Sequence, residues 1–289
     1  MNEKKINIDP LKYTLDNLEL ENKNIYLGVD FFSLIKHLNI KNYSFFEATE
    51  YILNYIKKTI GKDGNIIIPV FNFDCVLQKK FHIINSDGQS GAFGNILLKK
   101  FYNFRTYHPM YSFLCLGKKV DDYKKKRNHN ATGKRSLWKN FIDENYDLIS
   151  LGHHWNRSFT HVHYIENLLN VDYRFNLNFP VKYFETKKKF SYKNFSFFAR
   201  KKGICEFSGI TFECDKLFMK EKISKFYRHK NLISFKLNIK QATDILIEDL
   251  SKNSEKLISY IRPNKNNKNV LYSGDGTMLS LEKKYLKCI

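Results

Sequence analysis

Residues 61–71 read GKDGNIIIPVF and place a glycine, an Asp-Gly turn and an unbroken apolar run next to one another. An apolar run that does not alternate with polar residues is typical of a strand buried on both faces, as in α/β sheets. Gly61 stands where the last turn of a preceding helix usually ends. This stretch therefore predicts a helix end, a tight turn and a central strand, in that order.

Helices and short apolar strands alternate on both sides of this stretch. Ser44 and Glu47 form a capping box at the start of the helix that Gly61 ends. The alternation predicts an α/β fold, with a central, largely parallel or mixed sheet flanked by helices. Strands are expected over residues 25–32, 66–71, 111–116 and 147–151, and helices over 44–60, 92–104, 136–144 and 158–169.

The pattern changes in the second half of the chain. Residues 181–199 alternate apolar and charged side chains, which is typical of a hairpin with one face in water. Helices are expected over residues 215–228 and 241–252, on either side of a strand over 232–237. This half therefore predicts a smaller α+β portion.

The change of pattern falls near Pro180, but no clean linker marks it. We expect a single domain over residues 1–289. Its core should cover about residues 20–180 and its C-terminal lobe about 181–260. Residues 261–289 have the composition of a surface loop followed by a tail.

The composition is that of a folded, strongly basic protein. Of the 289 residues, 43% are hydrophobic, which is enough for a large packed core, and the formal net charge is +20. Such a charge favours an anionic partner. However, the lysines are scattered, asparagine and isoleucine are also frequent, and A/T-rich coding produces the same composition. Because no nucleic-acid recognition motif is present, we expect no nucleic-acid partner.

We expect a cytoplasmic protein, because the sequence shows neither a signal peptide, a membrane-spanning stretch nor a disulfide pattern. The first residues lack the apolar stretch of a signal peptide, and no window approaches the roughly 20 apolar residues of a membrane span. The cysteines are odd in number and widely spaced, without a CxxC motif, so we expect neither a disulfide framework nor a cysteine zinc site. They are Cys75, Cys115, Cys205, Cys214 and Cys288.

Residues 152–166, GHHWNRSFTHVHYIE, are the densest candidate for a functional site. They follow a predicted buried strand and lead into a predicted helix, and ligands of α/β proteins gather at such strand ends. His163 and Glu166 lie one helical turn apart, so the carboxylate can orient the imidazole and make it a better proton acceptor. This spacing predicts an acid–base pair.

Two other interpretations of this segment remain open at this point. One is a solvated helix face that happens to carry a histidine. The other is a metal site, but positions two apart, such as His161 and His163, diverge on a helix, so we expect no metal. Other potential metal ligands in the same segment are His153, His154 and Glu166.

The segment YHPMYS, residues 107–112, is a second candidate. His108 and Ser112 would suit a pocket mouth, although an ordinary proline-stiffened turn explains the segment equally well. Cys115 lies inside an apolar strand, which favours a buried, inert thiol over a nucleophile. No nucleophile elbow, phosphate-binding loop or dinucleotide fingerprint is present.

Several segments together resemble the aminoglycoside 3-N-acetyltransferase family and its relatives that acylate amino sugars. The resemblance covers about residues 20–180. It includes residues 61–71, the stretch GAFGNILLKKFYNFRTYHPMYSFLCLG at 91–117, and THVHYIE at 160–166, which matches a Thr-x-x-His-x-x-Glu pattern. Residues 133–136 and the strand DLISLG at 147–152 fall between these blocks in the expected order.

The resemblance implies acyl transfer from acetyl-CoA or another acyl-CoA to a primary amine in a ternary complex, on a fold distinct from the GNAT fold. It implies that His163 and Glu166 are the catalytic pair. Asp74 and Asn156 are expected to contact the acceptor. The residues expected to line the CoA channel are Asp30, Phe31, Phe71, His108 and Ser112.

Two departures from the family pattern bear on the acceptor. The first strand continues as Gly28-Val29-Asp30 where the family usually has His-Ser-Ser, and Met110-Tyr111 replaces the usual Thr-His. These changes weaken any expectation of antibiotic specificity, and they leave the His–Glu pair untouched.

The net charge favours an anionic, nucleotide-linked amino sugar over a polycationic aminoglycoside. We therefore expect an N-acyltransferase of surface-polysaccharide synthesis. The alternatives are an aminoglycoside 3-N-acetyltransferase that confers antibiotic resistance and a non-catalytic basic binding protein. The acyl chain and the oligomeric state stay open, and a homo-oligomer is compatible with the sequence.

Overall fold

The computed structural model describes residues 9–38, 43–201, 204–205, 207–252, 257–263 and 269–270. The helices are α1 (Asp9–Leu18), α2 (Phe31–Leu38), α3 (Phe45–Ile60), α4 (Asp74–Gln78), α5 (Ala92–Phe101), α6 (Val120–Lys125), α7 (Leu137–Asp143), α8 (Val162–Leu168), α9 (Phe212–Lys220) and α10 (Ile239–Ser251), with 3-10 turns at Tyr102–Phe104 and Trp155–Arg157. The strands are β1 (Asn24–Val29), β2 (Asn65–Pro69), β3 (Lys80–His82), β4 (Phe113–Gly117), β5 (Asp147–Leu151), β6 (Arg174–Phe184), β7 (Phe190–Arg200), β8 (Phe207–Ile210), β9 (Ser224–His229), β10 (Leu232–Asn238), β11 (Ile258–Pro263) and β12 (Asn269–Val270).

A six-stranded mixed sheet runs through the middle of the molecule in the order β4-β2-β1-β5-β10-β9. Strand β1 is parallel to both β2 and β5, whereas β4 and β10 add antiparallel strands on either side. The predicted α/β fold with a mixed sheet flanked by helices is confirmed. The parallel centre brings the ends of β1, β2 and β5 to one edge, where ligands of such sheets bind.

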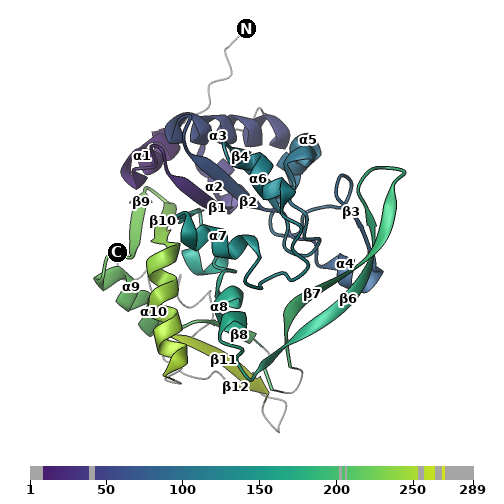
Figure 1. The fold of residues 1–289 in the computed structure, drawn as a ribbon. Helices are drawn as coiled ribbons and strands as arrows, with labels where there is room; N and C mark the ends of the chain where they lie inside the picture. Colours follow the sequence, from purple (N-terminus) through teal and green to yellow (C-terminus); the bar gives the residue numbers. More distant parts are fainter. Residues whose placement is uncertain are drawn as a thin grey trace.

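Helices cover both faces of this sheet (Figure 1). Alternate residues of one strand enter different cores: Ile25 packs with α1, α2, α3 and α5, whereas Tyr26 packs with α7, α8 and α10. Ile66 and Ile67 divide in the same way. Because side chains alternate along a strand, only a sheet buried on both faces can use an unbroken apolar run, which explains the composition of β2.

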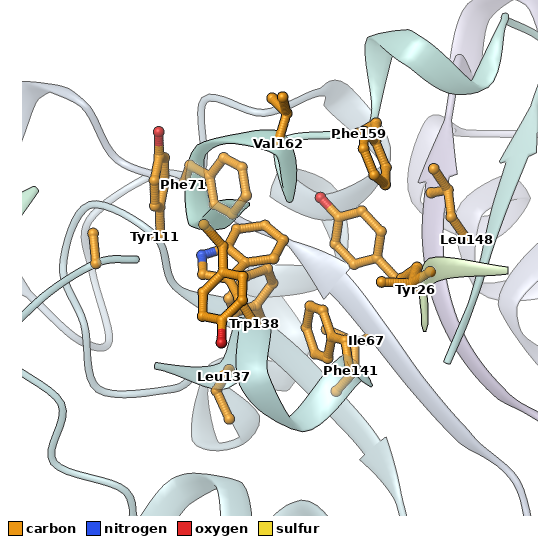
Figure 2. Close-up of a cluster of buried hydrophobic side chains, with 14 of the residues drawn as sticks. Tyr26, Ile67, Phe71, Tyr111, Leu137, Trp138, Phe141, Leu148, Phe159 and Val162 are labelled. Atoms are coloured by element: carbon orange, nitrogen blue, oxygen red, sulfur yellow. The ribbon is translucent and has the colours of Figure 1, made fainter. Parts of the chain in front are cut away.

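An aromatic cluster fills the core on the α7 side (Figure 2). The Trp138 ring lies edge-on to Phe113 at 5.1 Å between ring centroids and to Phe141 at 5.4 Å. Tyr111 lies 4.8 Å from Phe71 and extends this cluster towards the end of β2. The Trp138 contacts are edge-to-face arrangements that aromatic rings prefer, whereas the Phe71–Tyr111 pair is tilted at 53°. Together these rings pack the segment that follows β2 against the core.

Strands β6 and β7 form a long antiparallel hairpin that projects from the body of the protein, with β3 alongside it (Figure 1). Arg174 opens β6 and pairs directly with Arg200, which closes β7. Pro180 lies inside β6, so the change of sequence pattern falls within a strand. Strands β9 and β10, which follow it, complete the central sheet. The division into a core over 20–180 and a lobe over 181–260 stays a prediction.

Several expected elements end earlier or start later than the sequence indicated. The helix expected over 215–228 is confirmed only as far as Lys220, where α9 ends; Lys222 turns at a φ of 58°, and β9 follows. The strand expected over 25–32 ends at Val29, because the Asp30 carboxylate accepts from the Ser33 N–H and starts α2.

Three more boundaries differ. The helix expected over 158–169 begins at Val162, after a 3-10 turn. Ser136 stands at the start of α7 without a capping hydrogen bond from its side chain. Strand β11 continues to Pro263, beyond the expected start of the tail, and most of the tail lies outside the described residues.

Candidate active site

His163 and Glu166 are hydrogen-bonded to each other on α8. The His163 Nδ1 atom lies 2.7 Å from the Glu166 Oε2 atom. Because an ionised carboxylate only accepts hydrogen bonds, Nδ1 carries the proton that joins the two groups. The neutral imidazole then keeps its lone pair on Nε2, where it can accept a proton.

Glu166 is fully buried, so the interpretation of this helix face as solvated is wrong. Its Oε2 atom also lies 2.7 Å from Arg174 Nε, and its Oε1 atom accepts from the Tyr173 hydroxyl at 3.1 Å. Burial raises the pKa of Glu166, but His163 and Arg174 outweigh it, and the net pKa lies below the ordinary value. Glu166 is therefore a fixed negative charge behind the imidazole.

The His163 side chain is 23% exposed and borders a cavity of about 340 Å³, here called the His163 cavity. Burial lowers the pKa of His163, Glu166 opposes the shift, and Arg174 and Arg200 add to it. The imidazole is thus neutral at pH 7 and ready to accept a proton. The cavity is lined by Phe73, Met110, Tyr111, His163, Arg174, Phe197, Phe198, Ala199, Arg200 and Ser208.

A second cavity of about 350 Å³ lies where β1, β2 and β5 end, next to the first turn of α5, and is here called the Gly91 cavity. Arg157 contributes a positive charge to it. The segment from Ser158 to His163 leads from this cavity to the His163 cavity. It is lined by Leu27, Gly28, Val29, Asp30, Phe31, Phe32, Ile68, Pro69, Ser90, Gly91, Ala92, Phe93, Gly94, His153, Arg157 and Ser158.

The structure brings part of the predicted CoA channel together. Asp30 and Phe31 both line the Gly91 cavity. Phe71 lies between the two cavities, because its N–H donates to Ser90 Oγ at 3.1 Å and its ring packs on Tyr111. These three residues therefore share the region between α5 and α8.

His108 and Ser112 line neither cavity, because both are buried and bonded to the protein. His108 Nδ1 accepts from the Tyr111 N–H at 3.2 Å, and burial lowers the pKa of His108 to about 3. The Ser112 hydroxyl donates to the Val70 carbonyl and accepts from Arg105 Nε, both at 2.9 Å. Their geometry indicates support of the loop rather than contact with a cofactor.

The two residues expected to contact the acceptor also lie outside the cavity linings. Asp74 opens α4, beside Phe73, and Asn156 lies in the 3-10 turn before Arg157. Each is thus a neighbour of a lining residue, and its role in acceptor binding stays a prediction.

The histidines of residues 152–166 point to different partners. His153 Nε2 lies 2.8 Å from Ser158 Oγ, and His161 Nε2 lies 2.9 Å from Thr243 Oγ1. His154 lies 3.2 Å from Asp215, in a different part of the core. Within the described residues no three histidine, cysteine or acidic side chains gather as metal ligands.

Sequence reasoning missed four residues that complete the site. Arg174 and Tyr173 hold Glu166, Arg200 borders the His163 cavity, and Arg157 borders the Gly91 cavity. The arginines at 174 and 200 belong to strands, and their approach to α8 depends on how the hairpin docks. No local spacing reports such a long-range contact.

Residues 37–225 match the sequence profile of the family described as aminoglycoside 3-N-acetyltransferase. The chain belongs to this family. It is accordingly a CoA-dependent N-acetyltransferase, as expected from the resemblance of its sequence motifs. A comparison with curated proteins gives no match.

Several solved structures share the fold of this chain at low sequence identity. AAC-VIa bound to sisomicin is 13% identical, with a TM-score of 0.67 over 84% of this chain and 96% of that chain. AAC-IIIb in binary complex with CoASH is 14% identical, with a TM-score of 0.65 over 84% and 95%. The YokD protein from Bacillus subtilis is 14% identical, with a TM-score of 0.62 over 84% and 92%. Among the described residues, no helix is both long and apolar enough to cross a membrane.

Proposed function

We propose that this enzyme transfers an acetyl or short acyl group from acyl-CoA to the primary amine of an amino sugar, in the cytoplasm, for surface-polysaccharide synthesis. The observation that carries the reaction is the His163 imidazole, held by a buried carboxylate and bordering a cavity. A histidine in this setting is suited to take a proton from an attacking amine.

The reaction needs one base and no enzyme nucleophile. The amine nitrogen attacks the thioester carbonyl, His163 Nε2 takes the proton that the nitrogen loses, and the C–S bond breaks. The proton can then pass to the leaving thiolate, so that CoA leaves as the thiol and the imidazole is neutral again. Glu166 stabilises the imidazolium between these two steps, because its carboxylate lies 2.7 Å from Nδ1.

The Gly91 cavity is the proposed CoA site. The backbone amides at the start of α5 and the Arg157 guanidinium suit the phosphates of CoA. The Asp30 carboxylate also faces this region, but it already accepts from the Ser33 N–H as the cap of α2. The acyl end would then pass Phe71 towards His163, where the acceptor binds.

A second candidate is acetylation of an aminoglycoside. It is favoured by the family description and by the sisomicin complex of AAC-VIa. A non-catalytic binding protein is a third candidate, which the intact His–Glu pair argues against.

The test is release of free CoA thiol with amino sugars, nucleotide amino sugars and aminoglycosides as acceptors. His163→Ala should lower turnover by about 10²- to 10⁴-fold while CoA affinity, measured by calorimetry, stays within about twofold. His229→Ala, on edge strand β9, is the matched control and should keep wild-type turnover. Normal turnover in His163→Ala would remove the proposed base, and CoA binding without thiol release from any amine would favour the binding protein.

A further inference from the structure

The His163 cavity carries positive charge on one wall. Its lining includes the guanidinium groups of Arg174 and Arg200 and, among the described residues, no aspartate or glutamate. Arg174 and Arg200 are paired directly across the β6–β7 ladder, so their side chains leave the same face of the hairpin. Two like charges in this arrangement repel each other unless anions neutralise them.

Of these two arginines, only Arg174 forms an ion pair with a carboxylate in the described part of the chain. Arg174 is 5% exposed in its side chain, and its Nε atom lies 2.7 Å from Glu166. Its other nitrogens donate to the Phe198 carbonyl and to Ser208 Oγ. The charge of Arg174 and its two terminal nitrogens are thus used within the protein.

Arg200 is exposed, and in the described part of the chain it makes no ion pair. Its charge is nevertheless close to the reaction centre, because Arg200 lines the same cavity as His163 and Tyr111. The guanidinium therefore offers a planar set of donors at the mouth of the cavity.

We propose that Arg200 binds an anionic group of the acceptor, a phosphate or a carboxylate, while the acceptor amine reaches His163. This proposal rests on the proposed function and deepens it, because it assigns the substrate class to amino sugars that carry a negative charge. Arginine matches the geometry of both anions with two parallel hydrogen bonds. An aminoglycoside, which carries several positive charges, would meet the unpaired guanidinium instead of a carboxylate.

The test compares acceptors that differ in charge. Glucosamine, glucosamine 6-phosphate, a UDP-linked amino sugar, galactosaminuronic acid and kanamycin would each be assayed by thiol release with wild type, Arg200→Gln and Arg200→Lys. Lys188→Gln is the matched control, because it removes the same charge in the exposed hairpin turn, roughly 33 Å along β7 from Arg200.

Wild type should prefer an anionic acceptor. In Arg200→Gln the preference for the anionic acceptor over glucosamine should fall by about 10- to 100-fold, because the KM for the anionic acceptor rises. Arg200→Lys should restore part of the preference, and Lys188→Gln should keep it. The anionic acceptor whose preference falls most in Arg200→Gln identifies the group that Arg200 binds: a phosphate, a diphosphate or a carboxylate. Equal losses for glucosamine and the anionic acceptors, or a wild-type preference for kanamycin, would overturn the proposal.

Calorimetric binding of the same acceptors to the CoA complex gives a readout that does not depend on turnover. If no amine releases thiol, the proposed function fails, yet tighter binding of anionic acceptors to wild type than to Arg200→Gln still supports the anion site. If thiol is released and binding is unchanged in Arg200→Gln, the anion site fails and the acyltransferase stands.

Discussion

Replacing Glu166 with glutamine tests the most strongly held group of the site. The carboxylate is fully buried, and its Oε2 atom lies 2.7 Å from both His163 Nδ1, which is hydrogen-bonded to it, and Arg174 Nε, which forms an ion pair with it. Glutamine has nearly the same shape but no charge. It leaves the Arg174 guanidinium buried without its anion and lets the amide group of the new side chain face Nδ1, which favours the imidazole tautomer with its proton on Nε2.

The structure sets the size of both effects. Removing one partner of a buried ion pair costs about 3–5 kcal/mol of stability, and we expect the lower end because glutamine is nearly isosteric and keeps one oxygen that can accept a hydrogen bond. Loss of the correctly oriented base should lower kcat by about 10²- to 10⁴-fold. CoA affinity should change little, because Glu166 lines neither cavity.

Urea denaturation gives the change in free energy of unfolding, and thiol release gives kcat for the same preparation. The matched control is Glu185→Gln, which removes a carboxylate that is 40% exposed and 2.7 Å from Lys193 on the outer part of the hairpin. Exposed pairs contribute less than about 1 kcal/mol, so the control should stay near wild type in stability and turnover. A folded Glu166→Gln protein with wild-type kcat would refute the proposed role of the carboxylate.

Two further predictions concern the imidazole and the first strand. Because burial and two arginines lower the pKa of His163 below 6.5, the acid limb of kcat/KM should lie below pH 6.5, and Arg200→Gln should move it to higher pH by removing one of those charges. A pH–rate series, corrected for titration of the acceptor amine, measures both, and a limb that moves to lower pH contradicts the assignment. Gly28→Ala should destabilise the protein by about 1–3 kcal/mol, because the new Cβ would lie 2.6 Å from Ser158 Cβ. Urea midpoints check this, and adding Ser158→Gly should recover most of the loss; no recovery means that the clash lies elsewhere.

Much of the fold could be predicted because the decisive signals are local. The run at 66–71 predicted β2, Ser44 and Glu47 predicted the start of α3, and residues 147–151 predicted β5 with both of its ends. The second half was harder to predict, since the edge strand β9 has a charged, half-exposed sequence. Its strand conformation comes from pairing with β10, which is a tertiary contact.

The site was predictable only in part for the same reason. The spacing of His163 and Glu166 on one helix makes their contact local, and the structure confirms that contact. The spacing says nothing of the burial of Glu166, which depends on Arg174 and Tyr173 reaching it from the start of β6. His108 and Ser112 were predicted to line a pocket, but their side chains are buried and form hydrogen bonds with backbone groups of the protein. The sequence alone does not show these bonds.

Arg174 and Arg200 face each other at the open end of the β6–β7 hairpin, and we propose different roles for them. The first residue, Arg174, balances the carboxylate that holds the base, so a change there alters stability and turnover together. The last residue, Arg200, is exposed beside the same cavity and bonds to none of the three groups that hold Glu166, so we expect a change there to act on acceptor binding and on the pKa of His163. Because the two positions face each other across one ladder, the proposed acceptor site lies directly beside the proposed base.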